Sequence, residues 1–179
     1  MISQQVFKQA VEKTLWYLDH ANIVVTEQEK QHIEVADFSL GDLERIGIEV
    51  VTYINTDRVC AKELVLFPFQ TCPEHYHPVI GDYPGKEETF RCRWGKMFLY
   101  VEGTSTQHIH AIVPEGIYTV FHEIVLHPGE QYTIKPNTRH WFQSGPEGGI
   151  VSEFSTPSFD DLDIFIDPRI QRKPEITTE

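Results

Sequence analysis

The sequence lacks features that would place the protein in or across a membrane. No apolar run approaches the roughly 18–20 consecutive residues that a membrane helix requires. The N-terminal stretch MISQQVFKQA lacks the basic segment followed by an apolar one that marks a secretory signal. Its three cysteines, Cys60, Cys72 and Cys92, show no CxxC spacing, which favours reduced core thiols over a disulfide framework. We therefore expect a soluble, cytoplasmic protein.

Positive charge is scarce as well. The 179 residues include 15 Lys+Arg against 27 Asp+Glu, a formal net charge of −12. A chain this acidic repels nucleic acid and anionic membrane surfaces unless basic residues cluster, and no such cluster is visible. A small neutral molecule, or one held through a cation, is the expected partner. The length suits a single domain of about 100–200 residues.

Residues 1–46 are predicted to form a helical segment that packs on the rest of the protein. Apolar residues recur there at spacings of four and three, as on one face of a helix: Phe7, Val11, Leu15 and Leu18. Thr26 and Glu29 have the spacing of a capping box, which predicts that a second helix begins after Thr26. A third, short helix is expected over residues 40–45.

After Gly47 the sequence predicts β-structure. Short β-branched or aromatic runs alternate with turn residues, and the expected strands cover residues 48–54, 59–68, 96–102, 118–126, 131–135, 140–144 and 150–154. The GPEGG stretch at 145–149 predicts a hairpin between the last two. Short strands without interleaved helices favour an antiparallel sandwich or barrel. The polar residues 171–179, with Pro174 among them, predict a flexible tail.

A set of histidines suggests a metal site. Side chains two apart on a strand share a face, so His75 and His77 can present two imidazoles to one ion. Glu87 or Glu88 on the neighbouring strand and His140 on a later one would complete the ligands. Such a set suits Mn, Fe, Co, Ni or Zn and leaves positions open for a substrate. An isolated His-x-His is more often an ordinary hydrogen-bonded pair, so the prediction depends on His140.

A second His-x-His motif competes with the first. His108 and His110 are followed by Glu115, which supplies the same types of ligand. Their surroundings, however, indicate a connection between strands, and ligands on loops are less well pre-organised than ligands on strands. We therefore expect the principal site at His75 and His77.

The same residues resemble the motifs of the cupin family. His75 and His77 with Glu88 and Gly95 resemble the first cupin motif, although the gap before Glu88 is long. Pro136 and His140 resemble the second motif, without its usual glycine. Four segments are similar to the short bacterial D-lyxose isomerases, within a resemblance that runs from about residue 62 to 172: Cys72–His75, Pro84–Arg93, Pro136–Gln143 and Ser152–Ser155.

The resemblance implies a fold, a cofactor and an activity. The fold would be mainly β, a single cupin domain over 1–179 whose double-stranded β-helix (jelly-roll barrel) has the N-terminal α-helices packed outside. A divalent ion, Mn²⁺ by preference, would bind four side chains: His75, His77, Glu88 and His140. The family interconverts D-lyxose and D-xylulose, with D-mannose and D-fructose as a second pair, by proton transfer through a cis-enediol. Cupins commonly pair, so a homodimer is expected.

The resemblance also points to acid–base residues. Glu153 shares a strand face with Val151, so it points inward if Val151 is in the core, and a partly desolvated carboxylate is a candidate general base. Lys62, among apolar neighbours, and Lys86, two positions before Glu88, are candidates for stabilising negative charge or exchanging a proton. Strand lysines are more often solvated edge residues. Asp163 is a weaker candidate near the sugar hydroxyls, with a surface cap as the alternative.

Other activities remain open on the sequence. A phosphosugar isomerase of the same fold would need basic residues around its pocket, and Arg91, Arg93 and Lys86 are candidates. A non-catalytic sugar-binding or sensor cupin would bind metal and sugar without turnover. An iron-dependent dioxygenase would use the same histidine and glutamate ligands with O₂.

Overall fold

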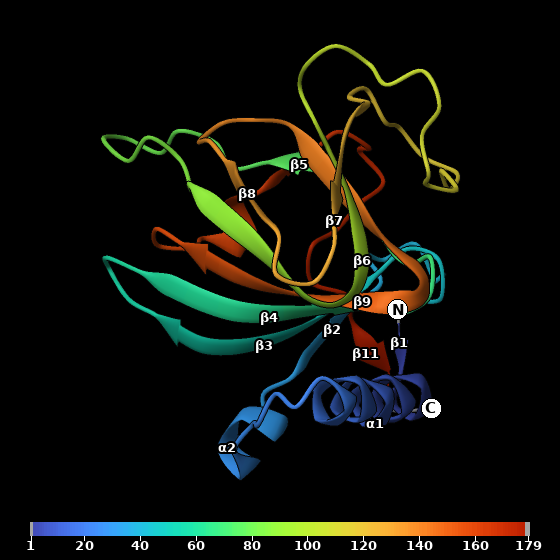
Figure 1. The fold of residues 1–179 in the computed structure, drawn as a ribbon. Coiled ribbons are helices and arrows are strands. Elements are labelled where there is room, and N and C mark those ends of the chain that lie inside the picture. Colours follow the sequence, from blue (N-terminus) through green and yellow to red (C-terminus); the bar gives the residue numbers. More distant parts are fainter. Residues whose placement is uncertain (1, 178–179) are drawn as a thin grey trace.

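Two long strands organise the fold. The computed structural model describes residues 2–177, and within them β6 and β9 run antiparallel along most of their lengths (Figure 1). The elements in chain order are β1 (Ile2–Ser3), α1 (Gln4–His20), α2 (Glu27–Lys30), β2 (Glu34–Ala36), β3 (Ile48–Asn55), β4 (Cys60–Leu66), β5 (Thr71–Tyr76), β6 (Glu88–Val101), β7 (His122–Leu126), β8 (Gln131–Ile134), β9 (His140–Ser155), the 3₁₀ turn η1 (Asp160–Leu162), β10 (Ile164–Phe165) and β11 (Ile176–Thr177).

The pairing of these strands produces two layers that curl around a common core. One layer contains β2, β3, β4, the second half of β9, the first half of β6 and β8. The other contains β10, β5, the first half of β9, the second half of β6 and β7. All of these pairs are antiparallel. The prediction of an antiparallel β barrel with an N-terminal helix is confirmed.

The predicted hairpin at 145–149 is wrong, because β9 continues through it as one bent strand. Lys96 of β6 faces the four residues 145–148, a bulge at which both strands pass from one layer to the other. Gly95 has φ +67°, and a side chain on it would collide with the carbonyl oxygen of Gly148. Gly95 and Gly148 therefore allow the backbones of β6 and β9 to approach closely at the bulge. The chain does not reverse here.

The N-terminal segment is partly as predicted. The side chain of Ser3 caps α1, and α2 has the predicted capping box at Thr26, although it spans one turn only. No helix forms over 40–45. Instead, the Asp37 carboxylate accepts hydrogen bonds from the backbone N–H groups of Ser39 and Gly41, at 2.9 and 3.2 Å, and Gly41 has φ +74°. This positive φ is incompatible with a right-handed helix.

Helix α1 lies outside the layer that contains β3 and β4 (Figure 1). Tyr17 and Leu18 on its buried face belong to a cluster with Val51, Val65 and Ile150, which project from the outer surface of that layer. The side chains pointing the other way, such as Val50, Leu64 and Val151, form the core between the layers. The three cysteines are free and buried, as predicted.

The C-terminal segment returns to the N-terminus. β11 pairs in parallel with β1, beside α1, and Arg172 donates a hydrogen bond to the Glu34 carboxylate. The predicted flexible tail covers 171–179, of which 178–179 lie outside the described residues. Arg172, Ile176 and Thr177 thus have defined partners elsewhere in the fold.

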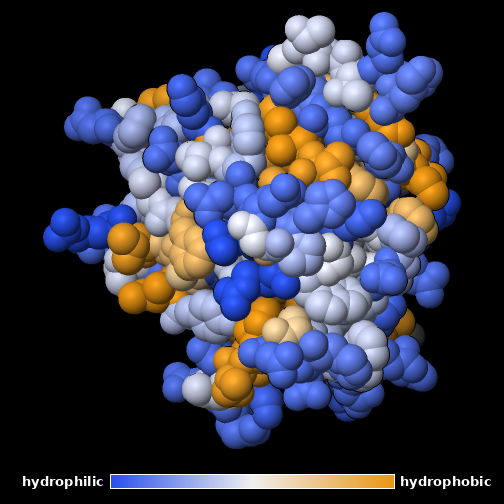
Figure 2. Space-filling model, viewed as in Figure 1, coloured by the Kyte–Doolittle hydropathy of each residue, from blue (hydrophilic) through white to orange (hydrophobic). Residues whose placement is uncertain are grey.

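The surface agrees with the acidic composition. Figure 2 shows a predominantly hydrophilic face on which apolar side chains form separate patches. No helix in residues 2–177 has the length and apolar character needed to cross a membrane.

A buried carboxyl group beneath α1 leads to a prediction about stability. Glu49 is fully buried on β3; Gln70 donates to its Oε1 at 3.3 Å, and its Oε2 has no hydrogen-bond partner. Burial raises the pKa of Glu49 well above its usual value, against the weaker opposing effects of Gln70 and Lys13. The folded state therefore binds a proton that the unfolded state releases, so this stability is lost as pH rises toward the folded-state pKa.

We expect Glu49→Gln to remove a slope of up to about 1.4 kcal/mol per pH unit from the stability profile above the usual glutamate pKa. Urea denaturation of both proteins from pH 5 to pH 8 measures this. The wild type should lose stability relative to the variant as pH rises. Parallel profiles for the two proteins would contradict the assignment.

Candidate metal and substrate site

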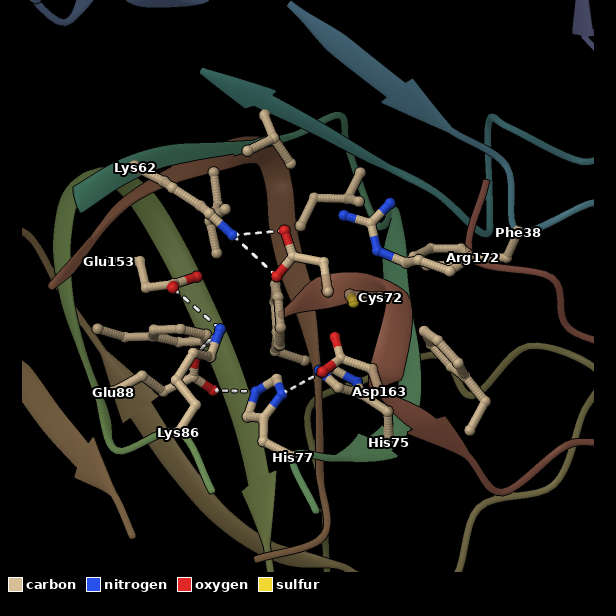
Figure 3. A pocket seen from close by; sticks show the side chains of 17 residues that line it. Phe38, Lys62, Cys72, His75, His77, Lys86, Glu88, Glu153, Asp163 and Arg172 are labelled. Carbon is tan, nitrogen blue, oxygen red and sulfur yellow. Dashed lines mark hydrogen bonds and ion pairs between the residues drawn. The ribbon is translucent and has the colours of Figure 1, made fainter. Parts of the chain in front are cut away.

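A cavity between the two layers collects most of the ionisable residues singled out in the sequence. Its apolar wall includes Val50, Leu64 and Phe90, which belong to the inner core. Ionisable side chains from β4, β5, β6, β9 and the segment after β9 point into the remaining space (Figure 3). The cavity therefore joins parts of the chain from Lys62 to Arg172.

Three histidines converge at the wall of this cavity, and two of them, His75 and His77, line it. His75 on β5 pairs in register with His140 on β9, and His77 follows directly after β5. One ring nitrogen of each lies within 4.8 Å of the others, and all three are buried. The Nδ1–H of His75 donates to Pro73 O at 2.8 Å, and that of His140 donates to Thr138 O at 2.9 Å. These bonds leave the Nε2 lone pairs directed inward, as metal ligation requires.

Glu88, the first residue of β6, completes the set. Its Oε1 lies 3.2 Å from His77 Nε2 and 3.0 Å from His140 Nε2. His140 Nε2 has no well-aligned hydrogen-bond partner although it is buried. A buried lone pair without a partner beside two imidazoles and a carboxylate fits a divalent first-row cation. Glu87, the alternative ligand, is exposed, whereas Glu88 is buried beside the histidines.

The pKa values of His75, His77 and Glu88 follow from burial and from the charges around each group. Burial, reinforced by the other two histidines, holds the pKa of His75 well below its usual range. Burial and Lys86 also disfavour a charged His77, but Glu88 and Asp163 outweigh them and raise its pKa to about 9. Burial alone would raise the pKa of Glu88; Lys86 and His77 overcome this effect and hold it well below its usual value.

Glu153 points into the cavity, as its spacing from Val151 predicted. Val151 is in the inner core, and Glu153 is 3% exposed. Its Oε1 accepts a hydrogen bond from Lys86 Nζ at 3.0 Å and one from Ser155 Oγ at 3.1 Å. Lys86 Nζ also lies 2.7 Å from Glu88 Oε2. One ammonium group thus bridges the candidate base and the candidate metal ligand (Figure 3).

Lys62 is buried in the same cavity rather than solvated at an edge. It pairs in register with Glu153, and its Nζ lies 2.7 Å from Asp160 Oδ2 and 3.0 Å from Ser158 Oγ. Burial lowers the pKa of Lys62, but Glu153 and Asp160 outweigh burial and raise it. Lys62 therefore carries its positive charge at neutral pH.

The segment after β9 supplies groups whose positions the sequence did not reveal. Asp160 pairs with Lys62, and Arg172 lines the cavity between Phe38 and Glu34. Asp163 also lines the cavity, but its Oδ1 is 2.5 Å from His77 Nδ1. One oxygen of this carboxylate is thus bonded to a histidine rather than available to a sugar hydroxyl.

The competing motif does not form a comparable site. The side chain of His110 is 62% exposed and its Nδ1 is 2.8 Å from Glu123 Oε2. Glu115 is also exposed, near Arg169. Within residues 2–177, the metal-ligand geometry is found at His75, His77 and His140.

Comparison with solved structures agrees with the fold. An L-ribose isomerase of Cellulomonas parahominis superposes with a TM-score of 0.74 at 14% identity, and one of Acinetobacter sp. DL28 with 0.72 at 13%. Each superposition covers 98% of both chains. Two curled antiparallel layers define the cupin fold, a double-stranded β-helix, and the three buried histidines between them suggest a metal site.

Sequence relatives narrow this class. A D-lyxose/D-mannose isomerase of Thermosediminibacter oceani is 60% identical over 179 residues, covering 98% of this chain and 99% of the relative. D-lyxose ketol-isomerases of a Thermofilum species and of Cohnella laeviribosi are 57% and 64% identical, covering 98% and 87% of this chain and 99% and 87% of the relatives. No family model matches. The chain belongs to the D-lyxose ketol-isomerase family.

Proposed function

We propose that this protein interconverts D-lyxose and D-xylulose, with D-mannose and D-fructose as a secondary pair, and that it requires a divalent cation, Mn²⁺ by preference. The observation that carries the proposal is the buried His75, His77, His140 and Glu88 cluster beside Glu153, in a member of this family. A cupin that served only as a scaffold would have no need of so many ionisable groups in its interior, because each is costly to bury.

The cavity contains a group for each step of an aldose–ketose isomerisation. A cation bound at His75, His77, Glu88 and His140 would supply Lewis acidity to the sugar oxygens. Glu153 then takes the proton from C2 of the open-chain sugar and returns it at C1, through a cis-enediol. The ammonium groups of Lys86 and Lys62, which face Glu153, stabilise the negative charge that develops on the sugar oxygens.

The ion pairing of the basic groups in the cavity favours a neutral sugar over a phosphosugar. Within the described residues, the lysine and arginine side chains that line it are Lys62, Lys86 and Arg172. Each already has a carboxylate partner: Lys62 pairs with Asp160, Lys86 with Glu88 and Glu153, and Arg172 with Glu34. Arg91 and Arg93 lie outside the cavity, where Arg91 donates to Gln131 and Arg93 to Ser152. Among the described residues of the cavity, no lysine or arginine is therefore left unpaired for the phosphate of a phosphosugar.

Turnover of metal-stripped protein tests the proposal. We expect no ketose from D-lyxose after chelation, and recovery of D-xylulose formation when Mn²⁺ is added back. D-Mannose should react more slowly, and the phosphates of the same sugars should not react. Stoichiometric Mn²⁺ binding without ketose from any sugar would overturn the proposal and favour a sensor or a dioxygenase, which O₂ uptake with Fe²⁺ would separate. The predicted homodimer and cytoplasmic location stay predictions.

A further inference from the structure

The three histidines of the cluster are not held in the same way. The Nδ1–H groups of His75 and His140 donate to backbone carbonyls, those of Pro73 and Thr138. His77 instead donates from Nδ1 to a side-chain carboxylate, Asp163 Oδ1, at 2.5 Å. The side chains of His77 and Asp163 are 7% and 8% exposed, so the bond is shielded from water. At Nδ1, His77 thus has a carboxylate partner, whereas His75 and His140 have backbone carbonyls.

The position of Asp163 is fixed by the fold. Asp163 lies between η1 and β10, and β10 pairs with β5, so that Ile164 faces Tyr76 and Phe165 faces His75. The strand that carries His75 therefore also holds the segment that carries Asp163. On the other side, Asp160 in η1 is paired with Lys62. The chain is thus held before Asp163 by the Asp160–Lys62 ion pair and after it by the pairing of β10 with β5.

A carboxylate partner does more to a histidine than a carbonyl does. Both fix the Nδ1–H tautomer and leave Nε2 free to ligate. The carboxylate adds a negative charge near the ring, which strengthens the Nε2 donor and favours bound cation. Removal of such a partner usually weakens metal affinity by about 10–100-fold.

We propose that Asp163 is a positioning residue for His77 and that it sets the affinity of the site for its divalent cation. The inference rests on the proposed metal dependence and replaces the sequence-based role of Asp163 as a ligand for sugar hydroxyls. Asp163, the partner of His77, belongs to the segment between η1 and β10. The partners of His75 and His140 are instead backbone carbonyls two residues away in the chain.

Direct titration of Mn²⁺ into metal-free protein tests the proposal without relying on activity. The signal of free Mn²⁺ in electron paramagnetic resonance gives the dissociation constant for wild type, Asp163→Asn and Asp163→Ala. We expect Asp163→Ala to bind about 10–100-fold more weakly, and Asp163→Asn to lie between the two because its carbonyl oxygen still accepts the Nδ1–H bond. Asp161→Asn is the matched control, because Asp161 lies in the same segment but pairs with Lys173 at the surface.

Two further readouts separate the possible roles. At saturating Mn²⁺, Asp163→Asn should keep the wild-type KM for D-lyxose, since the carboxylate does not bind sugar. Long-range ¹H–¹⁵N spectra of the metal-free proteins, recorded above the His77 pKa of about 9 so that the ring is neutral, should show a single Nδ1–H tautomer for His77 in the wild type and a mixture in Asp163→Ala. Unchanged Mn²⁺ affinity in both variants, or a raised KM with unchanged affinity, would overturn the inference. Failure of the wild type itself to bind Mn²⁺ would overturn the proposed function and this inference with it.

Discussion

Replacement of Glu153 by glutamine is expected to lower kcat for D-lyxose by about 100-fold to 10,000-fold, the usual contribution of a general acid–base group. The glutamine side chain would fit the same space and still accept the hydrogen bonds that Lys86 and Ser155 donate to Glu153. An amide oxygen, however, is far too weak a base to take a proton from carbon. Mn²⁺ affinity should stay at the wild-type value, because Glu153 does not contact the histidine cluster directly.

Glu63→Gln is the matched control for this substitution. Glu63 is also buried and neighbours Lys62 on β4, but it points to the outer side of the layer, where it accepts a hydrogen bond from Ser152 Oγ at 2.7 Å. This variant should keep wild-type kcat. A Glu153→Gln enzyme with kcat within a few-fold of wild type would exclude Glu153 as the base.

The fate of the transferred hydrogen provides an independent check on Glu153. A carboxylate that carries the proton between C2 and C1 lets part of it exchange with solvent, so D-xylulose formed in D₂O should contain deuterium at C1. Complete transfer of a C2 deuterium to C1 without any loss to water would favour a hydride shift instead.

The second large effect is expected for Glu88→Gln, which changes metal binding and stability together. The variant loses the negative charge that pairs with Lys86 and lies beside His77 and His140. Loss of one member of a buried ion pair lowers the free energy of unfolding by roughly 3–5 kcal/mol. Because Lys86 keeps its ion pair with Glu153, we expect a loss near the lower limit. Mn²⁺ affinity should fall on the order of 100-fold or more, beyond the usual effect of an outer partner.

The stability loss in this variant should depend on pH. The folded-state pKa of Glu88 lies below its unfolded value, so its contribution is present at neutral pH and disappears as pH falls toward the folded-state pKa. Urea denaturation of metal-free wild type and variant at several pH values measures the difference, which should shrink on acidification. Equal stability of the wild type and Glu88→Gln at pH 7 would show that the Lys86–Glu88 ion pair does not stabilise the fold.

Local periodicity was sufficient to predict much of the inner site. The spacing of His75 and His77 placed both rings on the same side, and the spacing of Val151 and Glu153 correctly indicated that Glu153 points inward. Lys62 was also a candidate because its neighbours are apolar. These are properties of single strands, in which a period of two determines the face on which a side chain lies.

Partners that meet through the fold could not be predicted in this way. Asp160 lies far from Lys62 in the chain, and Arg172 falls in a polar stretch whose composition resembles that of a tail. No local pattern indicates that η1 and β10 return across the cavity. The GPEGG stretch misled for a related reason, because glycine and proline mark a bent strand as readily as a turn.

The pairing of β6 with β9 also governs how the molecule reaches its native state. Glu88 and His140 begin two strands that are separated by β7, β8 and a long connection, so they meet only after a large loop has closed. Topologies dominated by such distant pairings fold slowly, in about milliseconds to seconds. The cation should then act after the rate-limiting step, so that it slows unfolding and protects the finished protein while leaving the refolding rate unchanged.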